Sequence, residues 1–232
     1  MDSNSINALA ENSEVINSLL NIIAALIYSF ATIFAAIVAI WSVRSWRKEF
    51  IGKRKIELVS NTRTLLYNVK SAIQAIRNPW TKENEGTTRK VTEFEDPLLK
   101  KFRDDINVTF ERYNRHIDIF NNLIAVKFKF MAEFGKDTEE HFDKIKHIIN
   151  TILVYAREYP DAQIERHDLT KEKKSLLTIS DSDLTKVNKD LDRVNKQIKE
   201  YQSFLYYQGR NDTVEKSIDD IISEIEKYID DF

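Results

Sequence analysis

The sequence from Val15 to Val43 contains no Asp, Glu, Lys, Arg or His. Thirteen of the 25 residues from Leu19 to Val43 are Leu, Ile, Val or Phe. A membrane-spanning helix needs about 20 predominantly apolar residues. Each of these side chains favours insertion by about 0.3 to 0.6 kcal/mol, which outweighs the cost of the few Asn, Ser and Thr residues among them. The run therefore predicts a transmembrane helix over residues 15–43.

Two other interpretations of this run are weaker. A cleaved secretory signal has basic residues ahead of an apolar core of about 7–15 residues. Residues 1–14 hold no Lys or Arg, and the run that follows them is longer than such a core. A buried helix of a soluble protein carries polar side chains on one face, whereas this run is apolar all round. We therefore interpret residues 1–14 as a short extracytoplasmic leader.

The charge distribution around the span predicts its orientation. No Lys or Arg precedes it, while basic residues and two tryptophans cluster at its C-terminal end. We call this cluster the interface anchor: Trp41, Arg44, Trp46, Arg47, Lys48, Lys53, Arg54 and Lys55. Because basic flanks stay inside and tryptophan favours membrane interfaces, we expect a single-pass protein of the inner (plasma) membrane with its N-terminus outside and its C-terminal domain in the cytoplasm. The same cluster would attract anionic lipid by about 1 kcal/mol per residue, although topology alone explains it.

Small and partly polar residues recur along one face of the span at intervals of three and four. We call this set the small-residue stripe: Asn21, Ala25, Ser29, Thr32, Ala36 and Ala39. Small residues let two helices approach closely in lipid, and a hydroxyl or amide can donate across the contact. The stripe therefore predicts self-association of the span, with a monomeric anchor that holds incidental alanines as the alternative.

The remainder of the chain is predicted to be helical. Its 232 residues include only four Gly and three Pro, too few for the turns of an all-β domain, and no Cys. The lack of Cys excludes disulfides and thiolate chemistry. The net charge of −2 shows none of the basic excess typical of nucleic-acid binding. The predicted fold class is all-α: an N-terminal transmembrane helix continues into a cytosolic helical bundle with a C-terminal coiled-coil-like hairpin.

Apolar spacing predicts the segments that follow the span. Residues 44–78 keep apolar positions at intervals of three and four until Asn78-Pro79, which predicts a juxtamembrane amphipathic helix. Residues 79–97 show no apolar period and are predicted to form a surface loop. Residues 99–131 keep one apolar face, which predicts a single long helix ending near Gly135.

A third helix is predicted beyond this glycine. Asp137 followed by Glu140 is typical of a helix N-terminus. Residues 142–156 then present one apolar face before Pro160, where we expect the helix to end. Residues 161–175 are highly charged without a clear period, which indicates a loop or a short helix.

The clearest periodicity lies near the C-terminus of the cytosolic bundle, which is predicted to cover residues 98–232. Apolar residues alternate strictly at three and four, as in a narrow coiled-coil contact. We call them the seam: Leu184, Val187, Leu191, Val194, Ile198, Tyr201 and Leu205. Gly209 ends this helix, Asn211 or Asp212 caps the next, and a similar rhythm continues to Phe232. We expect an antiparallel helical hairpin over residues 183–231, whose seam packs either within the chain or against another chain.

Motifs for catalysis or cofactor binding are weak in this sequence. It contains no phosphate-binding loop, no dinucleotide-binding glycine motif and no H-E-x-x-H. Glu139, Asp143 and His147 stand four residues apart and could share a helix face, but solvated charges explain them equally well. The alternating residues 127–130 (K-F-K-F) point in different helical directions, which fits core and rim better than nucleic-acid contact. No catalytic residue, metal, cofactor, nucleic acid or small-molecule ligand is therefore expected.

One resemblance concerns residues 15–80. The outward-starting span, the motif W-R-K-E-F at residues 46–50 and the amphipathic stretch ending A-I-R-N-P-W at residues 75–80 resemble small bacterial inner-membrane proteins with a cytosolic helical domain. The resemblance is one of organisation. Some proteins of this layout act as membrane effectors in bacterial phage defence, which the resemblance implies only as a possible role.

Three functional hypotheses follow. The first is a membrane-anchored, non-enzymatic interaction or scaffold protein that binds itself or another protein, with the lipid bilayer as its second partner. The second is a membrane-perturbing effector, for example of a phage-defence system, that acts through oligomerised spans. The third is an enzyme with an unrecognised helical active site, which would show turnover in the cytosolic part alone.

Overall fold

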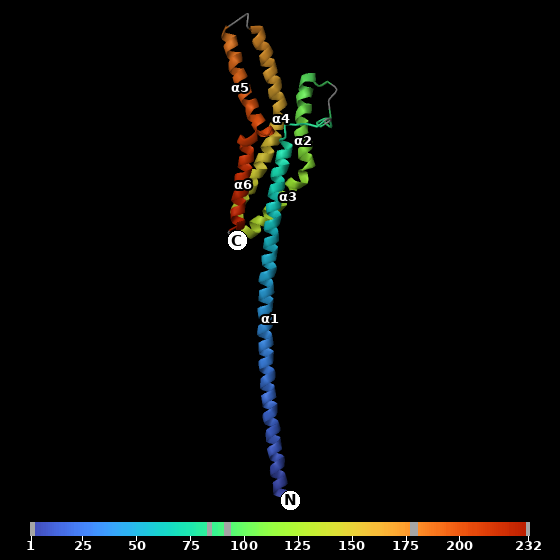
Figure 1. Cartoon of the computed structure of the whole chain (residues 1–232), viewed down its shortest axis with the longest axis vertical. Coiled ribbons are helices and arrows are strands. Elements are labelled where there is room, and N and C mark those ends of the chain that lie inside the picture. Colours follow the sequence, from blue (N-terminus) through green and yellow to red (C-terminus); the bar gives the residue numbers. More distant parts are fainter. Residues whose placement is uncertain (1–2, 83–84, 91–93, 177–180, 231–232) are drawn as a thin grey trace. The chain divides into compact units, whose positions relative to one another are not determined.

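The structure is a computed structural model that describes residues 3–82, 85–90, 94–176 and 181–230, and these residues contain helices and no strand (Figure 1). The all-α class is thereby confirmed for the described residues. Six α-helices follow one another: α1 (Ser3–Ile76), α2 (Pro97–Arg115), α3 (Ile117–Phe134), α4 (Glu139–Leu176), α5 (Asp181–Leu205) and α6 (Thr213–Asp230). Two short 3-10 helices, η1 (Lys136–Thr138) and η2 (Gly209–Asn211), precede α4 and α6.

The chain divides into two compact units, Met1–Glu57 and Leu58–Phe232, which are described separately. In the first unit, the large apolar side chains from Val15 to Ile51 are all exposed; Phe30, for example, is 71% exposed and Phe34 69%. Nothing in the described chain covers these side chains. One helix is therefore long and apolar enough to span a membrane.

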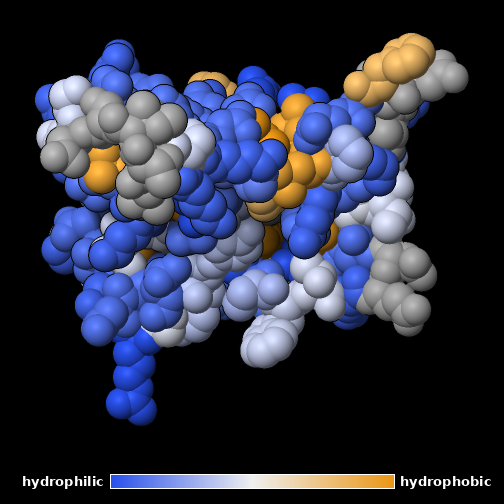
Figure 2. Space-filling view, turned by 90° about the horizontal axis from the view of Figure 1, so that it is seen from above, coloured by the Kyte–Doolittle hydropathy of each residue, from blue (hydrophilic) through white to orange (hydrophobic). Residues whose placement is uncertain are grey.

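The second unit has one hydrophobic core to which all six helices contribute. The fully buried side chains include Ile73 of α1, Phe130 of α3, Ile145 of α4, Val194 of α5 and Ile225 of α6. Phe130 packs against Phe134 and Phe142 with ring centroids 4.3 Å and 5.5 Å apart. The apolar face of α1 beyond Glu57 thus belongs to this core. Figure 2 shows one end of the surface as mainly hydrophilic, with hydrophobic residues in separate patches.

The single long helix expected over residues 99–131 is wrong. The helical path breaks at His116, which separates α2 from α3 and whose N–H donates to the Tyr113 carbonyl (3.0 Å). The break changes which residues face the core: Ile117, placed on the apolar face by its spacing, is 39% exposed, whereas Phe120 is 5% exposed. Phe120 stacks on Tyr113 across the break at 5.3 Å. The expected stop at Gly135 is confirmed, since this residue ends α3 with φ +108°.

Pro160 does not end a helix, contrary to expectation. Helix α4 passes through it and continues to Leu176, so residues 161–175 are helical. A proline inside a helix costs about 3 kcal/mol because it removes one backbone hydrogen bond and crowds the preceding turn. Apolar packing on the continuing helix offsets this cost, since Ala162 is 5% exposed in the core and Leu169 packs against that core. The expected N-terminal cap also differs, because Asp137 lies in η1 and accepts a hydrogen bond from the Tyr228 hydroxyl (3.0 Å).

The expected hairpin of α5 with α6 is also wrong. In Figure 1, α5 lies beside the second half of α4, and α6 lies beside the first half of α4. Arg193 of α5 pairs with Glu165 of α4 (2.5 Å), and the Tyr201 hydroxyl donates to Glu158 (2.7 Å). The seam is buried inside the chain by this contact, fully at Val187, Val194, Ile198, Tyr201 and Leu205 and partly at Leu184 and Leu191. Periodicity identified the buried face, and the neighbour across it is α4.

Candidate functional site: the apolar run and the end of helix α1

The small-residue stripe lies on an exposed face of the first unit. All six of its residues are exposed: Asn21, Ala25, Ser29, Thr32, Ala36 and Ala39. The Ser29 hydroxyl donates to the Ala25 carbonyl and the Thr32 hydroxyl to the Tyr28 carbonyl, each at 2.8 Å. Both hydroxyls are therefore satisfied within their own helix. What the stripe offers a second helix is close approach along the alanines, together with the Asn21 amide.

The interface anchor is exposed at seven of its eight positions, and Lys55 is half-buried. Trp46 stacks on Phe50 with ring centroids 5.5 Å apart, and the Arg54 guanidinium lies 5.9 Å from the centre of the Phe50 ring. Lys53 pairs with Glu49 one turn earlier at 2.7 Å. This hydrogen bond lowers the pKa of the Glu49 carboxyl. The segment after the uncharged run thus combines aromatic rings and cations, as an interfacial helix does.

The end of α1 is held by a buried arginine that sequence reasoning did not single out. Arg77 is 1% exposed and donates to both carboxylate oxygens of Asp212 (2.8 Å and 2.7 Å). Its remaining donors reach the carbonyls of Ser203, Phe204 and Tyr206 at 2.7–3.0 Å. All five bonds go to the corner between α5 and α6. A buried guanidinium with every group bonded fixes this corner to the end of α1.

Asp212 also accepts hydrogen bonds from two backbone amides at this corner. Its carboxylate accepts from the Glu215 amide (2.8 Å), which caps α6, and from the Gln208 amide (2.7 Å). The predicted cap at Asp212 is therefore confirmed. Burial raises the pKa of Asp212, but the hydrogen bonds from Arg77 and from the two amides outweigh burial and hold this pKa below its ordinary value. The carboxylate remains charged opposite Arg77.

A second buried arginine, Arg112 of α2, holds the loop after α1. It is 7% exposed and donates to both carboxylate oxygens of Glu85 (2.9 Å and 2.7 Å). It also donates to the carbonyls of Asn78 and Trp80. The described parts of the predicted loop over residues 79–97 are thus bonded to α2. The Arg112 guanidinium holds the pKa of the Glu85 carboxyl well below its usual range, against the opposing effect of burial.

A row of polar contacts joins the second-unit part of α1 to α6. Going along α1, basic or amide side chains at intervals of seven and four residues meet acidic side chains of α6. The contacts are Arg63 with Glu226 (3.2 Å) and Asp230 (3.0 Å), Lys70 with Asp219 (2.5 Å), and Gln74 with Glu215 (2.6 Å). The hydrogen bond to Asp219 raises the pKa of Lys70. Each contact is at least partly exposed, so the row gives register more than stability.

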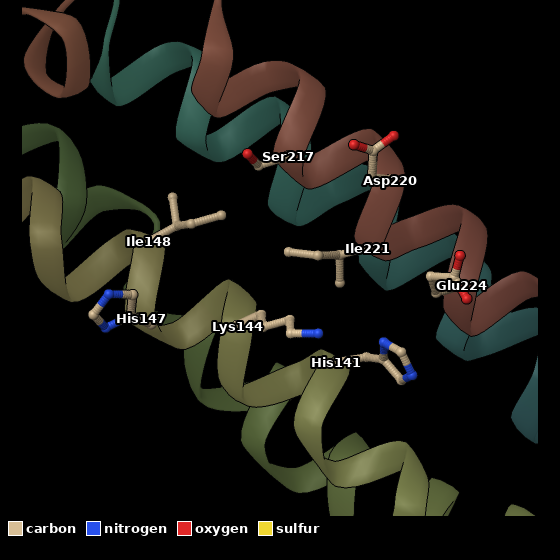
Figure 3. Close-up of a pocket in the computed structure, with 8 residues that line it drawn as sticks. All are labelled: His141, Lys144, His147, Ile148, Ser217, Asp220, Ile221 and Glu224. Atoms are coloured by element: carbon tan, nitrogen blue, oxygen red, sulfur yellow. The ribbon is translucent and has the colours of Figure 1, made fainter.

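A pocket of about 380 Å³ lies between α4 and α6 (Figure 3). Ile148 and Ile221 are buried in its lining, and polar side chains surround them. The polar residues are His141, Lys144 and His147 from α4 and Ser217, Asp220 and Glu224 from α6. Within the described residues, no group of three or more His, Asp or Glu side chains could hold a metal ion. The pocket has mixed charges and shows no built site for one ligand class.

The residues that were considered above for metal or nucleic-acid binding make contacts within the fold. Lys127 pairs with Glu139 (3.0 Å) and with Asp143 (2.7 Å), so these two carboxylates face an ammonium group. Phe130 is fully buried and Phe128 is 61% exposed, which agrees with the core and rim expected for residues 127–130. The structure brings the two acids to Lys127, while His147 lines the pocket described above.

Sequence reasoning missed Arg77 and Arg112 because charged side chains were assigned to the surface by default. A signal was present in the pattern. Arg77 stands four residues after Ile73, in phase with the apolar face of α1, and Arg112 stands three residues after the buried Thr109. A charge in the phase of an apolar face indicates a buried and paired charge, but it does not indicate the partner.

Within the described residues, the fold and these contacts define a helical protein with one exposed apolar helix long enough to span a membrane and a packed helical unit in which buried arginines hold the end of α1 and the loop that follows it. Comparison with family models, with curated proteins and with solved structures gave no match.

Proposed function

We propose that this protein is a membrane-anchored, non-enzymatic helical interaction protein that self-associates through its span. The observation that carries the proposal is the uninterrupted exposure of large apolar side chains from Val15 to Val43. Water would be a poor solvent for this surface, and a bilayer would cover all of it. In this arrangement the N-terminus lies outside and residues 58–230 form a cytoplasmic helical domain attached to the inner membrane.

A non-enzymatic role is supported by the way in which the second unit uses its buried charges. Arg77 is paired with Asp212, and Arg112 with Glu85, in contacts that hold backbone segments together. Buried pairs that bind backbone segments together are typical of structural ion-pair networks, which perturb pKa values without a catalytic role. The domain surface offers polar side chains and separate apolar patches, which suits contact with another protein (Figure 2).

Membrane insertion is the first point to test. We expect the full-length protein to stay in the membrane fraction after extraction with alkaline carbonate. The double variant Ile33→Arg, Ile37→Arg should be released, because each central Arg costs about 2.5–3.5 kcal/mol of insertion free energy. The matched variant Ile33→Ala, Ile37→Ala keeps the run uncharged and should remain in the membrane. Release of the unmodified protein by carbonate would contradict the proposal.

Self-association through the small-residue stripe is tested by measuring the oligomeric mass of the protein. We expect an oligomer of the full-length protein by light scattering in detergent, and its dissociation in the double variant Ala25→Leu, Ala36→Leu, since two larger side chains separate the helices. Ala24→Leu with Ala31→Leu is the matched control, because these two alanines lie about 100–140° from Ala25 and Ala36 around the helix. Equal masses for both double variants would show that the stripe is not the contact.

A second candidate function, the membrane-perturbing effector, is favoured by the same exposed stripe, since oligomerised spans can permeabilise a bilayer. Under this hypothesis, overexpression of the unmodified protein causes leakage of a dye across the membrane, and Ala25→Leu with Ala36→Leu abolishes that leakage without preventing insertion. An oligomer that causes no leakage would contradict the effector hypothesis and support the role of an interaction protein.

A further inference from the structure

Three basic residues follow the apolar run directly, on one face of α1. Arg44, Arg47 and Lys48 come after Val43, the last residue of the uncharged run. At about 100° of rotation per residue, Arg47 lies about 60° to one side of Arg44 and Lys48 about 40° to the other. The three cations therefore share an arc of about 100°.

These cations differ from Lys53 in lacking an acidic partner. Arg44, Arg47 and Lys48 are exposed, and none of them forms an ion pair within the part of the chain that the structure describes. Lys53, about 180° from Arg44 around the helix, is instead paired with Glu49 at 2.7 Å. The rule that relates basic residues to membrane orientation counts charges and does not require them on one face. Topology therefore accounts for the number of basic residues after the span, but not for the position of these three on one face of the helix.

The depth of each cation follows from the helical rise of about 1.5 Å per residue. Lys48 lies about 7.5 Å beyond Val43 along the axis, and one headgroup layer is about 5–7 Å thick. With Val43 at the edge of the hydrocarbon core, where Trp41 would lie at the interface, the backbones of Arg44 and Arg47 lie within the headgroup layer and that of Lys48 lies at its outer edge. The long Lys48 side chain can reach back to the lipid phosphates. Residues 54 and 55 lie about 16–18 Å beyond Val43, more than a Debye length of about 8 Å past that layer.

We propose that Arg44, Arg47 and Lys48 bind the phosphate group of an anionic phospholipid in the leaflet where the span ends. This inference rests on the proposed function, because it requires the span to be inserted. The two guanidinium groups donate paired hydrogen bonds to phosphate oxygens, and the ammonium group adds a point charge. Trp41 lies about 60° from Arg44 around the helix, on the same side as Lys48. At this position its indole packs at the membrane interface. Three unpaired cations favour a headgroup with net negative charge over a zwitterionic one.

The experiment uses the full-length protein in nanodiscs made from equal amounts of phosphatidylglycerol and phosphatidylcholine. Native mass spectrometry then counts the lipids of each kind that stay bound. The near-set variant is Arg44→Gln, Arg47→Gln, Lys48→Gln. The far-set variant removes the same formal charge: Lys53→Gln, Arg54→Gln, Lys55→Gln.

We expect the unmodified protein to retain phosphatidylglycerol in preference to phosphatidylcholine. The near-set variant should lose this preference at least tenfold, since each cation at the surface contributes about fivefold to binding of an anionic lipid. The far-set variant should keep it within about twofold, because its cations lie outside the headgroup layer.

Two results would overturn the proposal: an absence of preference in the unmodified protein, or an equal loss in both triple variants, which would indicate a diffuse attraction by total charge. Carbonate extraction of cell membranes that contain the same three proteins separates this inference from the proposed function. A protein that inserts but shows no lipid preference refutes the lipid site alone, whereas failure of insertion refutes both.

Discussion

Replacing Arg77 by Met is expected to destabilise the helical domain by about 3–5 kcal/mol, because the variant leaves the buried Asp212 carboxylate without its partner. The native guanidinium is 1% exposed and makes five hydrogen bonds at the α5–α6 corner. Total stabilities of about 5–15 kcal/mol are usual for a domain, so this loss would remove a large share. Urea unfolding of the full-length protein in detergent, followed by circular dichroism, measures it.

Two variants define how this result is interpreted. Arg63→Met removes an exposed pair, since the Arg63 side chain is 43% exposed, and should cost no more than about 1 kcal/mol. The double variant Arg77→Met, Asp212→Asn should be more stable than Arg77→Met alone, because Asn keeps the cap of α6 without a buried charge. A cost for Arg77→Met as small as that for Arg63→Met would mean that the buried pair is not what holds the corner.

Composition and the period of apolar side chains predicted part of the fold. The uncharged run and the strict spacing from Leu184 to Leu205 identified the apolar helix and a buried helical face. Period does not say which helix covers a face, so α5 was assigned to α6, whereas it packs on α4. The apolar period also does not reveal the break at His116, because the apolar residues before and after the break keep intervals of three and four.

Local rules failed where tertiary packing outweighed them. Pro160 usually ends a helix, but the packing of α5 along α4 stabilises the turns beyond it. The candidate site shows the same limit. The interface anchor is a prediction from the order of residues, because a bilayer of known thickness sets where basic and aromatic residues should follow a span. The pairs of Arg77 with Asp212 and of Arg112 with Glu85 join residues 135 and 27 positions apart, and only the folded chain shows which acid meets which base.

The pair formed by Arg112 and Glu85 gives a second large effect, which depends on pH. Arg112→Met is expected to cost about 3 kcal/mol near pH 7, because Glu85 then keeps its charge in a buried position with the exposed Arg115 as its charged partner and the Lys82 amide as a further donor. The pKa of Glu85 in the folded protein is depressed, chiefly by the hydrogen bonds from Arg112. A depressed carboxyl pKa stabilises the fold above the unfolded value of about 4.3, and this stabilisation is lost as the pH falls through the folded pKa.

The unmodified protein should therefore lose stability as the pH is lowered below about 4. Arg112→Met should lose less over the same range, because protonation of Glu85 relieves the unpaired charge in the variant. The difference between the two proteins is thus expected to shrink from about 3 kcal/mol at pH 7 towards the value of the lost neutral contacts, about 1 kcal/mol, in acid. Arg115→Met is the matched control: Arg115 also pairs with Glu85 but is 55% exposed, so its removal should cost about 1 kcal/mol or less. If the stability difference for Arg112→Met were the same at pH 7 and pH 3, the carbonyl contacts of Arg112, and not its charge, would hold the loop to α2.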